Sequence, residues 1–319
     1  MTPRSSWRAA ARKGTRVLEG GRALSLARLP VVGEGGEAMI YALGGGRVAK
    51  LFKAPDHPDY AADPAARDAV ARRLDEHQTK LGAFPPAPTP RLVAPATLLH
   101  DENGRVVGYT MAFIDGAELL VRYGERSFRE SAAPDDVVTA LFRELHGTLA
   151  AVHGAGIVVG DLNDLNVLVR GTEAWLIDAD SMQFHGYPCR VYTERFLDPR
   201  LADPRGARPI LARPYDQAAD WYAFACLLMQ SLLYVGPYGG VYRPRAAADR
   251  VAHDARPLHR LSVFHPDVRY PKPARPWGVL PEPLVEHLRG VFAHGVREPF
   301  PRPLLDALTW TRCTGCGTA

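Results

Sequence analysis

The residues with the clearest capacity for chemistry lie in the segment Gly160–Val169, which reads GDLNDLNVLV. In it a carboxylate, Asp161, and a carboxamide, Asn166, stand five positions apart, just before an apolar run. Asp178 follows a second apolar run twelve residues beyond Asn166. Mg²⁺ prefers oxygen ligands and takes only one or two from a protein, while phosphates supply others. The pattern therefore indicates a site for Mg²⁺ and a nucleotide phosphate.

A second group of candidate residues lies nearer the N-terminus. The stretch Gly33-Glu34-Gly35-Gly36-Glu37 lies between two expected strands. Its glycines would let backbone amides approach a phosphate, because no Cβ intervenes. Lys50 stands inside an apolar strand, which favours a point charge aimed at phosphate oxygens. Lys53, in contrast, fits a solvated strand face.

Composition and charge limit the class of protein. The chain has 319 residues, of which 46% are hydrophobic and 23% charged, as in a globular protein of one two-lobed domain or two small ones. A net charge of +4 does not argue for nucleic-acid binding, and no apolar run reaches the roughly 18 residues of a membrane span. The four cysteines suggest a reducing compartment, so we expect a cytoplasmic protein.

Two regions with different patterns must position these groups. Residues 23–115 predict five short strands and one main helix, after a basic arm at 1–22. The expected strands are 24–32, 38–43, 47–52, 96–99 and 106–113, and the helix runs from Asp63 and Pro64 to about Leu81. Residues 116–310 predict mainly helices, at 134–153, 222–233, 283–292 and 303–310, with a strand hairpin after the first.

Taken in order along the chain, these segments resemble the signature set of the protein kinase family over about residues 23–310. The matching segments are Gly33 and Gly35 with Ala38 in place of the third glycine, Val48-Ala49-Lys50, the loop Asp161–Asn166, Ile177-Asp178-Ala179-Asp180, Asp220 at the start of an apolar helix, and the Arg-Pro segment 297–303. The resemblance implies a bilobal α+β protein kinase fold. That fold has a five-stranded antiparallel N-lobe sheet with one main helix and a mostly helical C-lobe.

The resemblance also implies a role for each matching residue. Lys50 would contact the α- and β-phosphates of ATP, within a loop cradle made by Gly33, Gly35 and Gly36. Asp161 would accept the proton of a substrate hydroxyl or orient that hydroxyl.

Asn166 and Asp178 would hold Mg²⁺, and Asp180 would be either a further metal ligand or a capping residue. Asp220 would brace the loop that carries Asp161.

Two sets of nucleotide-binding residues rest on weaker patterns. Among the acids of the helix, Glu76 is chosen over Asp68 and Asp75 as the ion-pair partner of Lys50, and a plain surface acid is an equally good interpretation. In the expected hinge 109–116, backbone groups of Ala112 and Phe113 would meet adenine, and Met111 would line that pocket or belong to the core.

The chain also departs from the family pattern. Val159 and Gly160 replace the His-Arg that precedes the catalytic Asp, so the arginine that reads an activation-loop phosphate is missing. We therefore expect activity without phosphorylation of that loop. Arg200 replaces the usual Glu at the end of the activation segment, and Asp198 could take its place as the partner of Arg302.

The expected function is ATP- and Mg²⁺-dependent phosphoryl transfer to Ser or Thr of proteins, including the chain itself. The alternatives are a catalytically weak scaffold that binds nucleotide and a small-molecule phosphotransferase. The divergence resembles bacterial kinases that occur with von Willebrand-type and phosphatase partners, which become candidate partners; nucleic acid and membrane are not expected. Cys313 and Cys316 are either half of a zinc site at the start of a truncated segment, 311–319, or simply two thiols.

Overall fold

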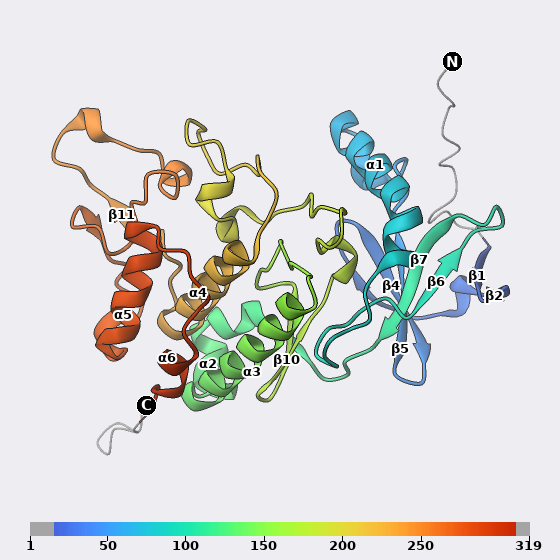
Figure 1. Cartoon of the computed structure of the whole chain (residues 1–319), viewed down its shortest axis with the longest axis horizontal. Coiled ribbons are helices and arrows are strands. Elements are labelled where there is room, and N and C mark those ends of the chain that lie inside the picture. Colours follow the sequence, from blue (N-terminus) through green and yellow to red (C-terminus); the bar gives the residue numbers. More distant parts are fainter. Residues whose placement is uncertain (1–15, 311–319) are drawn as a thin grey trace. The chain divides into compact units, whose positions relative to one another are not determined.

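The computed structural model describes residues 16–310 of the chain (Figure 1). The chain forms two compact units. Of the described residues, 16–87 and 93–115 belong to the first unit, and 88–92 and 116–310 belong to the second. The division after Asp115 coincides with the change in sequence pattern near residue 116. Most of the expected basic arm and the whole cysteine segment 311–319 lie outside the described residues.

The first unit contains one antiparallel sheet of seven strands, in the order β2-β1-β6-β7-β5-β4-β3. The strands are β1 (Val17–Glu19), β2 (Arg22–Leu24), β3 (Val31–Glu34), β4 (Ala38–Gly44), β5 (Arg47–Phe52), β6 (Thr97–His100) and β7 (Val106–Ala112). The expected positions of β4 to β7 were correct to within one residue at each end. These strands are largely apolar runs between clear turn signals, such as Gly44-Gly45-Gly46.

The expected sheet of five strands was wrong. Residues 17–24, which we assigned mainly to a basic arm, form the hairpin β1–β2, and Leu18 of β1 pairs with His100 of β6. Each of these strands has only three residues, and only Val17 among them is buried. An edge hairpin of this kind needs little apolar sequence, so its pattern does not stand out.

Helix α1 (Pro64–Lys80) covers one face of this sheet (Figure 1). Asp63 caps it, because its side chain accepts a hydrogen bond from the Ala66 N–H at 3.0 Å, and Pro64 occupies the first helical position. Val70 and Leu74 of α1 pack against Phe52 of β5 in one hydrophobic cluster. Alternate residues of a strand share a face, so the side chain of Lys50 leaves the sheet on the same face as Phe52.

The second unit contains five helices among its described residues, separated by small sheets and long segments without regular structure (Figure 1). The helices are α2 (Arg126–Ala132), α3 (Asp135–Gly154), α4 (Gln217–Leu233), α5 (Glu282–Arg289) and α6 (Arg302–Asp306). The strands are β8 (Glu118–Leu119), β9 (Val167–Arg170) and β10 (Glu173–Leu176) in one sheet, and β11 (Val241–Tyr242) and β12 (Val268–Arg269) in another. The expectation of a mostly helical second region was therefore also wrong, because prolines and arginines interrupt residues 184–216 and 234–281.

Helix α4 forms the centre of the second unit. All but three of its seventeen residues are buried, which confirms that this segment is apolar all round because it is enclosed. It begins earlier than expected, at Gln217, and Asp216 caps it through a hydrogen bond from the Ala219 N–H at 2.9 Å. Asp220 therefore lies inside the first turn, where its carboxylate is fully buried.

A second fully buried carboxylate, Asp198, forms an ion pair with Arg297. The guanidinium donates from Nε to Oδ2 at 2.8 Å and from Nη2 to Oδ1 at 2.9 Å, the two-point geometry that suits arginine. The expected partner, Arg302, instead pairs with Asp306 one helical turn away. The partner of Asp198 is therefore Arg297, and the prediction of Arg302 was wrong.

This difference gives a stability test. Arg297→Ala should lower the free energy of unfolding by about 3–5 kcal/mol, because it leaves the Asp198 carboxylate buried without its main partner. Arg302→Ala removes only an exposed pair and should change it by less than about 1 kcal/mol. Urea denaturation followed by circular dichroism measures both. Equal losses in the two variants would contradict the assignment.

Candidate active site

The segment that carries Asp161 is fixed by hydrogen bonds to Asp220. The Val159 N–H donates to Asp220 Oδ2 and the Gly160 N–H donates to Oδ1, both at 2.8 Å. His153 Nε2 lies 2.8 Å from the same Oδ2, so both oxygens of this buried carboxylate have hydrogen-bonding partners. The expected role of Asp220 as a brace is confirmed. The backbone immediately before Asp161 is held in one conformation.

Gly160 fills a position that no other residue fits. Its φ is +77°, and a Cβ built there would lie 2.7 Å from Cβ and 2.8 Å from Sγ of Cys189. Tyr215 closes the same space from another side, at 3.2 Å. The segment that follows Asp178 therefore packs, through Cys189, against residue 160 and leaves no room for a side chain at that position.

Asp161 lies in a polar but largely enclosed environment. Burial raises the pKa of its carboxyl, hydrogen bonds from Thr193 and Asn163 oppose that rise, and the nearby charge of Asp178 adds to it. Asn163 Nδ2 also donates to Thr193 Oγ1 and to the Asp161 carbonyl, both at 3.0 Å. Asp161 is thus a carboxylate of raised proton affinity that lies beside Thr193 and Asn163, the arrangement expected of a group that accepts a proton.

The residues proposed from the sequence as cation ligands differ in their surroundings. Asn166 Nδ2 donates to the Asp161 carbonyl at 2.9 Å, and among residues 16–310 we find no hydrogen bond to its side-chain oxygen. Asp178 is half-buried and has a left-handed backbone with φ +65°, an uncommon conformation that often marks functional residues. An amide oxygen and a carboxylate suit Mg²⁺.

Asp180 is set apart from these two residues. It is 1% exposed and lies within the 3₁₀ turn that runs from Ala179 to Ser181. The carboxylate of Asp178 is partly accessible, whereas that of Asp180 is enclosed. Among residues 16–310 we find no group of three or more His, Cys, Asp or Glu side chains that could hold a metal ion by themselves. Such a group is not needed for Mg²⁺, which usually keeps phosphate and water ligands.

In the first unit, Lys50 and Glu76 belong to the layer between the sheet and α1. Lys50 is buried, and its Nζ lies 5.8 Å from the centre of the Tyr109 ring, on the strand that pairs with it. Glu76 is half-buried on α1, while Asp68 and Asp75 are exposed. The choice of Glu76 among the three acids of α1 therefore agrees with their exposure.

The glycine-rich stretch is tied to the rest of the first unit by charged and polar contacts. Lys53 pairs with Glu34 at 3.0 Å, Arg73 of α1 pairs with Glu37, and the Tyr60 hydroxyl donates to the Gly36 carbonyl. Lys53 is 1% exposed, so its interpretation as a solvated strand residue was wrong. Its two acidic partners, Glu34 and Asp59, lie nineteen residues before it and six after it, so no local charge pattern indicates this role.

The surroundings of the three glycines, Gly33, Gly35 and Gly36, differ. Gly33 lies in β3, and its Cβ position would contact Ile40 at 3.4 Å. Gly35 and Gly36 have no neighbour within 4 Å at that position, and neither has a positive φ. Packing and backbone conformation within the described structure therefore do not require glycine at 35 and 36. The absence of side chains there favours the close approach of a ligand to the backbone.

The three expected hinge residues lie at the end of β7. Met111 is half-buried and packs against the cluster under α1, as its alternative core role predicts. Ala112 is exposed and pairs with Arg47, and the Phe113 N–H donates to the Gly46 carbonyl at 2.8 Å. The amide of Phe113 is therefore engaged within the sheet, and only its carbonyl is left to meet an adenine.

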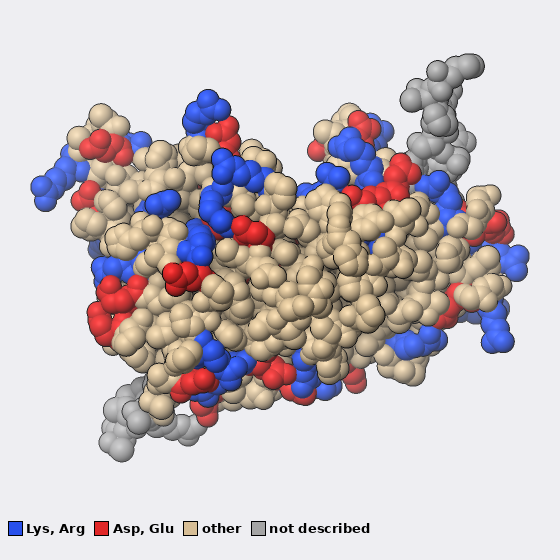
Figure 2. All heavy atoms as spheres, viewed as in Figure 1, with Lys and Arg blue, Asp and Glu red and all other residues tan. Residues whose placement is uncertain are grey.

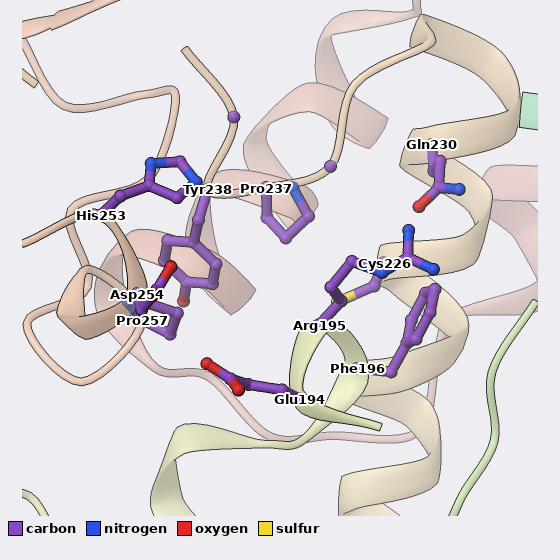
Figure 3. Close-up of a pocket in the computed structure, with 12 residues that line it drawn as sticks. Glu194, Arg195, Phe196, Cys226, Gln230, Pro237, Tyr238, His253, Asp254 and Pro257 are labelled. Atoms are coloured by element: carbon purple, nitrogen blue, oxygen red, sulfur yellow. The ribbon is translucent and has the colours of Figure 1, made fainter. Parts of the chain in front are cut away.

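A pocket of about 430 Å³ begins one residue beyond Thr193 (Figure 3). Glu194 and Phe196 form one wall, Gln230 of α4 another, and Asp254 and Tyr238 lie on the opposite side. Its rim is joined to the loop of Asp161, because Arg195 and Gln230 both contact the buried carboxylate of Asp164, at 3.2 and 3.0 Å. A volume of this size can hold a side chain and part of a peptide.

The sequence did not reveal Thr193 and Asn163 as site residues. Thr193 lies thirty residues beyond Asn163, and nothing in the chain between them indicates the contact. The signal that could have found Asn163 is the repeated carboxamide in Asn163-Asp164-Leu165-Asn166, since a loop side chain often caps its own backbone. Asn163 Oδ1 does so, by accepting from the Leu165 N–H at 2.8 Å.

Comparisons with known proteins do not add to this picture, since no family model and no curated protein matches the chain. Within the part that the structure describes, the helices are all too short or too polar to cross a membrane.

The contacts of Asp161 predict how its pKa responds to a change at Thr193. Thr193→Val removes a hydroxyl that stabilises the charged carboxylate, so the pKa of Asp161 should rise further, and the group should lose its proton only at higher pH. Thr193→Ser keeps the hydroxyl and should leave the pKa nearly unchanged. Carboxyl ¹³C NMR titration of the two variants measures this. A pKa in Thr193→Val at or below that of the unchanged chain would show that the hydroxyl does not act on Asp161.

Proposed function

We propose that this protein is a divergent member of the protein kinase family that transfers a phosphoryl group from ATP to Ser or Thr hydroxyls of proteins, with Mg²⁺. The observation that carries the proposal is the set of contacts around Asp161. A carboxylate of raised pKa, held by Thr193 and Asn163, shares one loop with the amide oxygen of Asn166, and Asp178 lies close enough to act on its charge. The residues match the family motifs in order, and the Asp220 brace supports the same interpretation.

In this proposal each residue has a separate task. Asp161 orients the acceptor hydroxyl and takes its proton as the hydroxyl oxygen bonds to the γ-phosphorus of ATP. The bond from that phosphorus to the bridging oxygen breaks, ADP leaves with this oxygen, and Thr193 keeps the carboxylate in place. Asn166 and Asp178 supply oxygen ligands, and a bound Mg²⁺ would neutralise charge on the phosphates of ATP. Lys50, whose burial strengthens its charge interactions, would contact the α- and β-phosphates.

Two features favour a polypeptide acceptor over a small molecule. The pocket of about 430 Å³ is continuous in sequence with Thr193, so a chain held at Asp161 could extend into it (Figure 3). Its rim is also tied to the catalytic loop through Asp164, which would fix the two relative to each other. A catalytically weak scaffold remains the second candidate, because Asp180 stands in the position of the family's glycine.

The setting of the protein is part of the proposal. Cys189 and Cys226 are buried free thiols, which suits a cytoplasmic location. The partners would be protein substrates, and phosphatase or von Willebrand-type proteins as candidates from the family resemblance. Nucleic acid is not among them: on the face drawn in Figure 2, basic side chains lie interspersed with acidic ones.

The proposal predicts transfer that depends on the two acidic residues of the site. With γ-labelled ATP, Mg²⁺ and casein or myelin basic protein, label should appear on the added protein and on the chain itself. Asp161→Asn and Asp178→Asn should each lower the rate by at least about a hundredfold, the scale on which proton transfer and charge stabilisation act. Glu125→Gln, an exposed change in the same unit, serves as the matched control.

The other candidates give different outcomes in this experiment. A chain that binds ATP in equilibrium dialysis yet labels no protein would be a scaffold. Label found only on a small molecule would identify the other enzyme class.

The proposal also predicts activity without a phosphorylated activation segment. Segment 181–193 contains only two Ser or Thr residues, Ser181 and Thr193. Ser181 Oγ donates to the Asp178 carbonyl at 2.9 Å and Thr193 Oγ1 accepts from Asn163, so both hydroxyls serve the site itself. Alanine at either position would disturb the site, so such variants do not test this point.

Phosphatase treatment tests it without mutation. The treated chain, shown by mass spectrometry to lack phosphate, should start transfer without a lag and at a rate within a few-fold of the untreated chain. A lag that disappears on preincubation with ATP would mean that the segment must be phosphorylated first.

A further inference from the structure

A separate pocket in the second unit is lined by four arginines. It has a volume of about 240 Å³, and its lining includes Arg200, Arg213, Arg260 and Arg297. None of the residues to which we assign a role in phosphoryl transfer lines this pocket. Its composition therefore needs a different explanation.

The positive charge of this pocket exceeds the negative charge around it. Arg297 pairs with Asp198, and Arg200 pairs with Asp216 at 2.7 Å and approaches Asp198 at 3.4 Å. Two carboxylates thus compensate two of the four guanidinium groups.

Arg213 and Arg260 form no ion pair among residues 16–310. Each donates only to a backbone carbonyl, of Arg200 and of His294, at 3.4 Å. The exposed Asp203 is mainly engaged by Arg205, whose hydrogen bonds lower its pKa, and Arg213 adds only a minor long-range effect.

Arg260 is held in place at a conformational cost. Its backbone has φ +53°, a left-handed conformation that is unfavourable for arginine. Its guanidinium lies over Gly295, where a Cβ would be only 2.8 Å from Cζ and 2.9 Å from Nη2. Gly295 itself has φ +73°. Both residues thus adopt uncommon conformations that bring this side chain against the pocket wall.

A cluster of guanidinium groups in a small cavity is suited to a phosphoryl group. Arginine offers planar pairs of N–H donors that match phosphate oxygens, and two uncompensated positive charges match a dianion. The volume lies below the roughly 300–1,000 Å³ of pockets for drug-sized ligands, which disfavours a whole nucleotide. Leu258 and Phe292 add apolar surface next to the arginines, which suits the carbon atoms and backbone of a phosphorylated side chain better than a free ion.

We propose that this pocket binds a phosphorylated serine or threonine side chain of a polypeptide. The arginines recognise the phosphoryl oxygens, and the apolar wall contacts the adjoining peptide. The site does not depend on the phosphoryl transfer proposed above, although a protein that both makes and binds phosphorylated side chains could retain its own products.

The test measures binding without ATP, on the full chain after phosphatase treatment, so that transfer plays no part. The probes are three fluorescein-labelled nonapeptides that differ only in a central phosphoserine, serine or glutamate. Fluorescence anisotropy should show the phosphoserine peptide binding at least tenfold more tightly than the serine peptide. Arg213→Gln/Arg260→Gln should lower that affinity at least tenfold, because it removes the two uncompensated charges.

Arg245→Gln/Arg250→Gln is the matched control, since it removes two exposed charges that do not line the pocket. It should change the affinity less than twofold. If Arg213→Gln/Arg260→Gln unfolds at a lower temperature than the unchanged chain, NMR on the unchanged chain replaces it. The arginine Nε–Hε signals of Arg213 and Arg260 should then shift when the phosphoserine peptide is added.

Three outcomes would overturn the proposal. They are equal binding of the phosphoserine and serine peptides, unchanged affinity in Arg213→Gln/Arg260→Gln, and inorganic phosphate binding as tightly as the phosphopeptide. The last would identify the pocket as a site for the free ion.

Discussion

The candidate site depends above all on the buried carboxylate of Asp220. A charged group without exposure is tolerated only if its oxygens are satisfied, and here two backbone amides and His153 do this. The same bonds fix the two residues that precede Asp161. The residues of α4 around Asp220 are almost all enclosed, so the carboxylate cannot move toward solvent. The Asp220 carboxylate thus fixes the loop that carries Asp161 relative to helix α4.

This constraint explains features that follow in the chain. With Val159 and Gly160 bonded to Asp220, residue 160 adopts a positive φ and leaves room for Cys189 to pack against it. The segment from Cys189 then reaches Thr193, which contacts Asp161, and ends at Asp198, the second buried carboxylate. The segment is therefore held at Cys189 by packing against Gly160 and at Asp198 by a buried ion pair with Arg297.

The sequence predicted those parts of the protein whose cause is local. Helix α1 has its cap and its proline within its first residues, and β4 and β5 are joined by a run of glycines. The hairpin β1–β2 was missed because short strands at the edge of a sheet bury few side chains and so need few apolar residues. Thr193 was missed because its role arises only when distant segments meet, and Arg297 was confused with Arg302 because burial distinguishes them, at 12% and 43% side-chain exposure. The residues proposed for the site were named from their type, their spacing and the family resemblance, whereas the partners of Asp161 required the fold.

The raised pKa of Asp161 has a consequence for the stability of the folded protein. Burial and the neighbouring charge of Asp178 raise its pKa, which makes it a better proton acceptor but also makes its ionised form unfavourable in the folded protein. Because this pKa is raised, the folded state binds the proton of Asp161 more tightly than the unfolded state does. Asp161 therefore adds stability below its unfolded pKa and loses that contribution as the pH rises through its folded value. At neutral pH the ionised carboxylate works against folding, and hydrogen bonds from Thr193 and Asn163 offset only part of that cost. The remainder must come from interactions elsewhere in the unit, such as the Asp220 network and the Asp198–Arg297 pair.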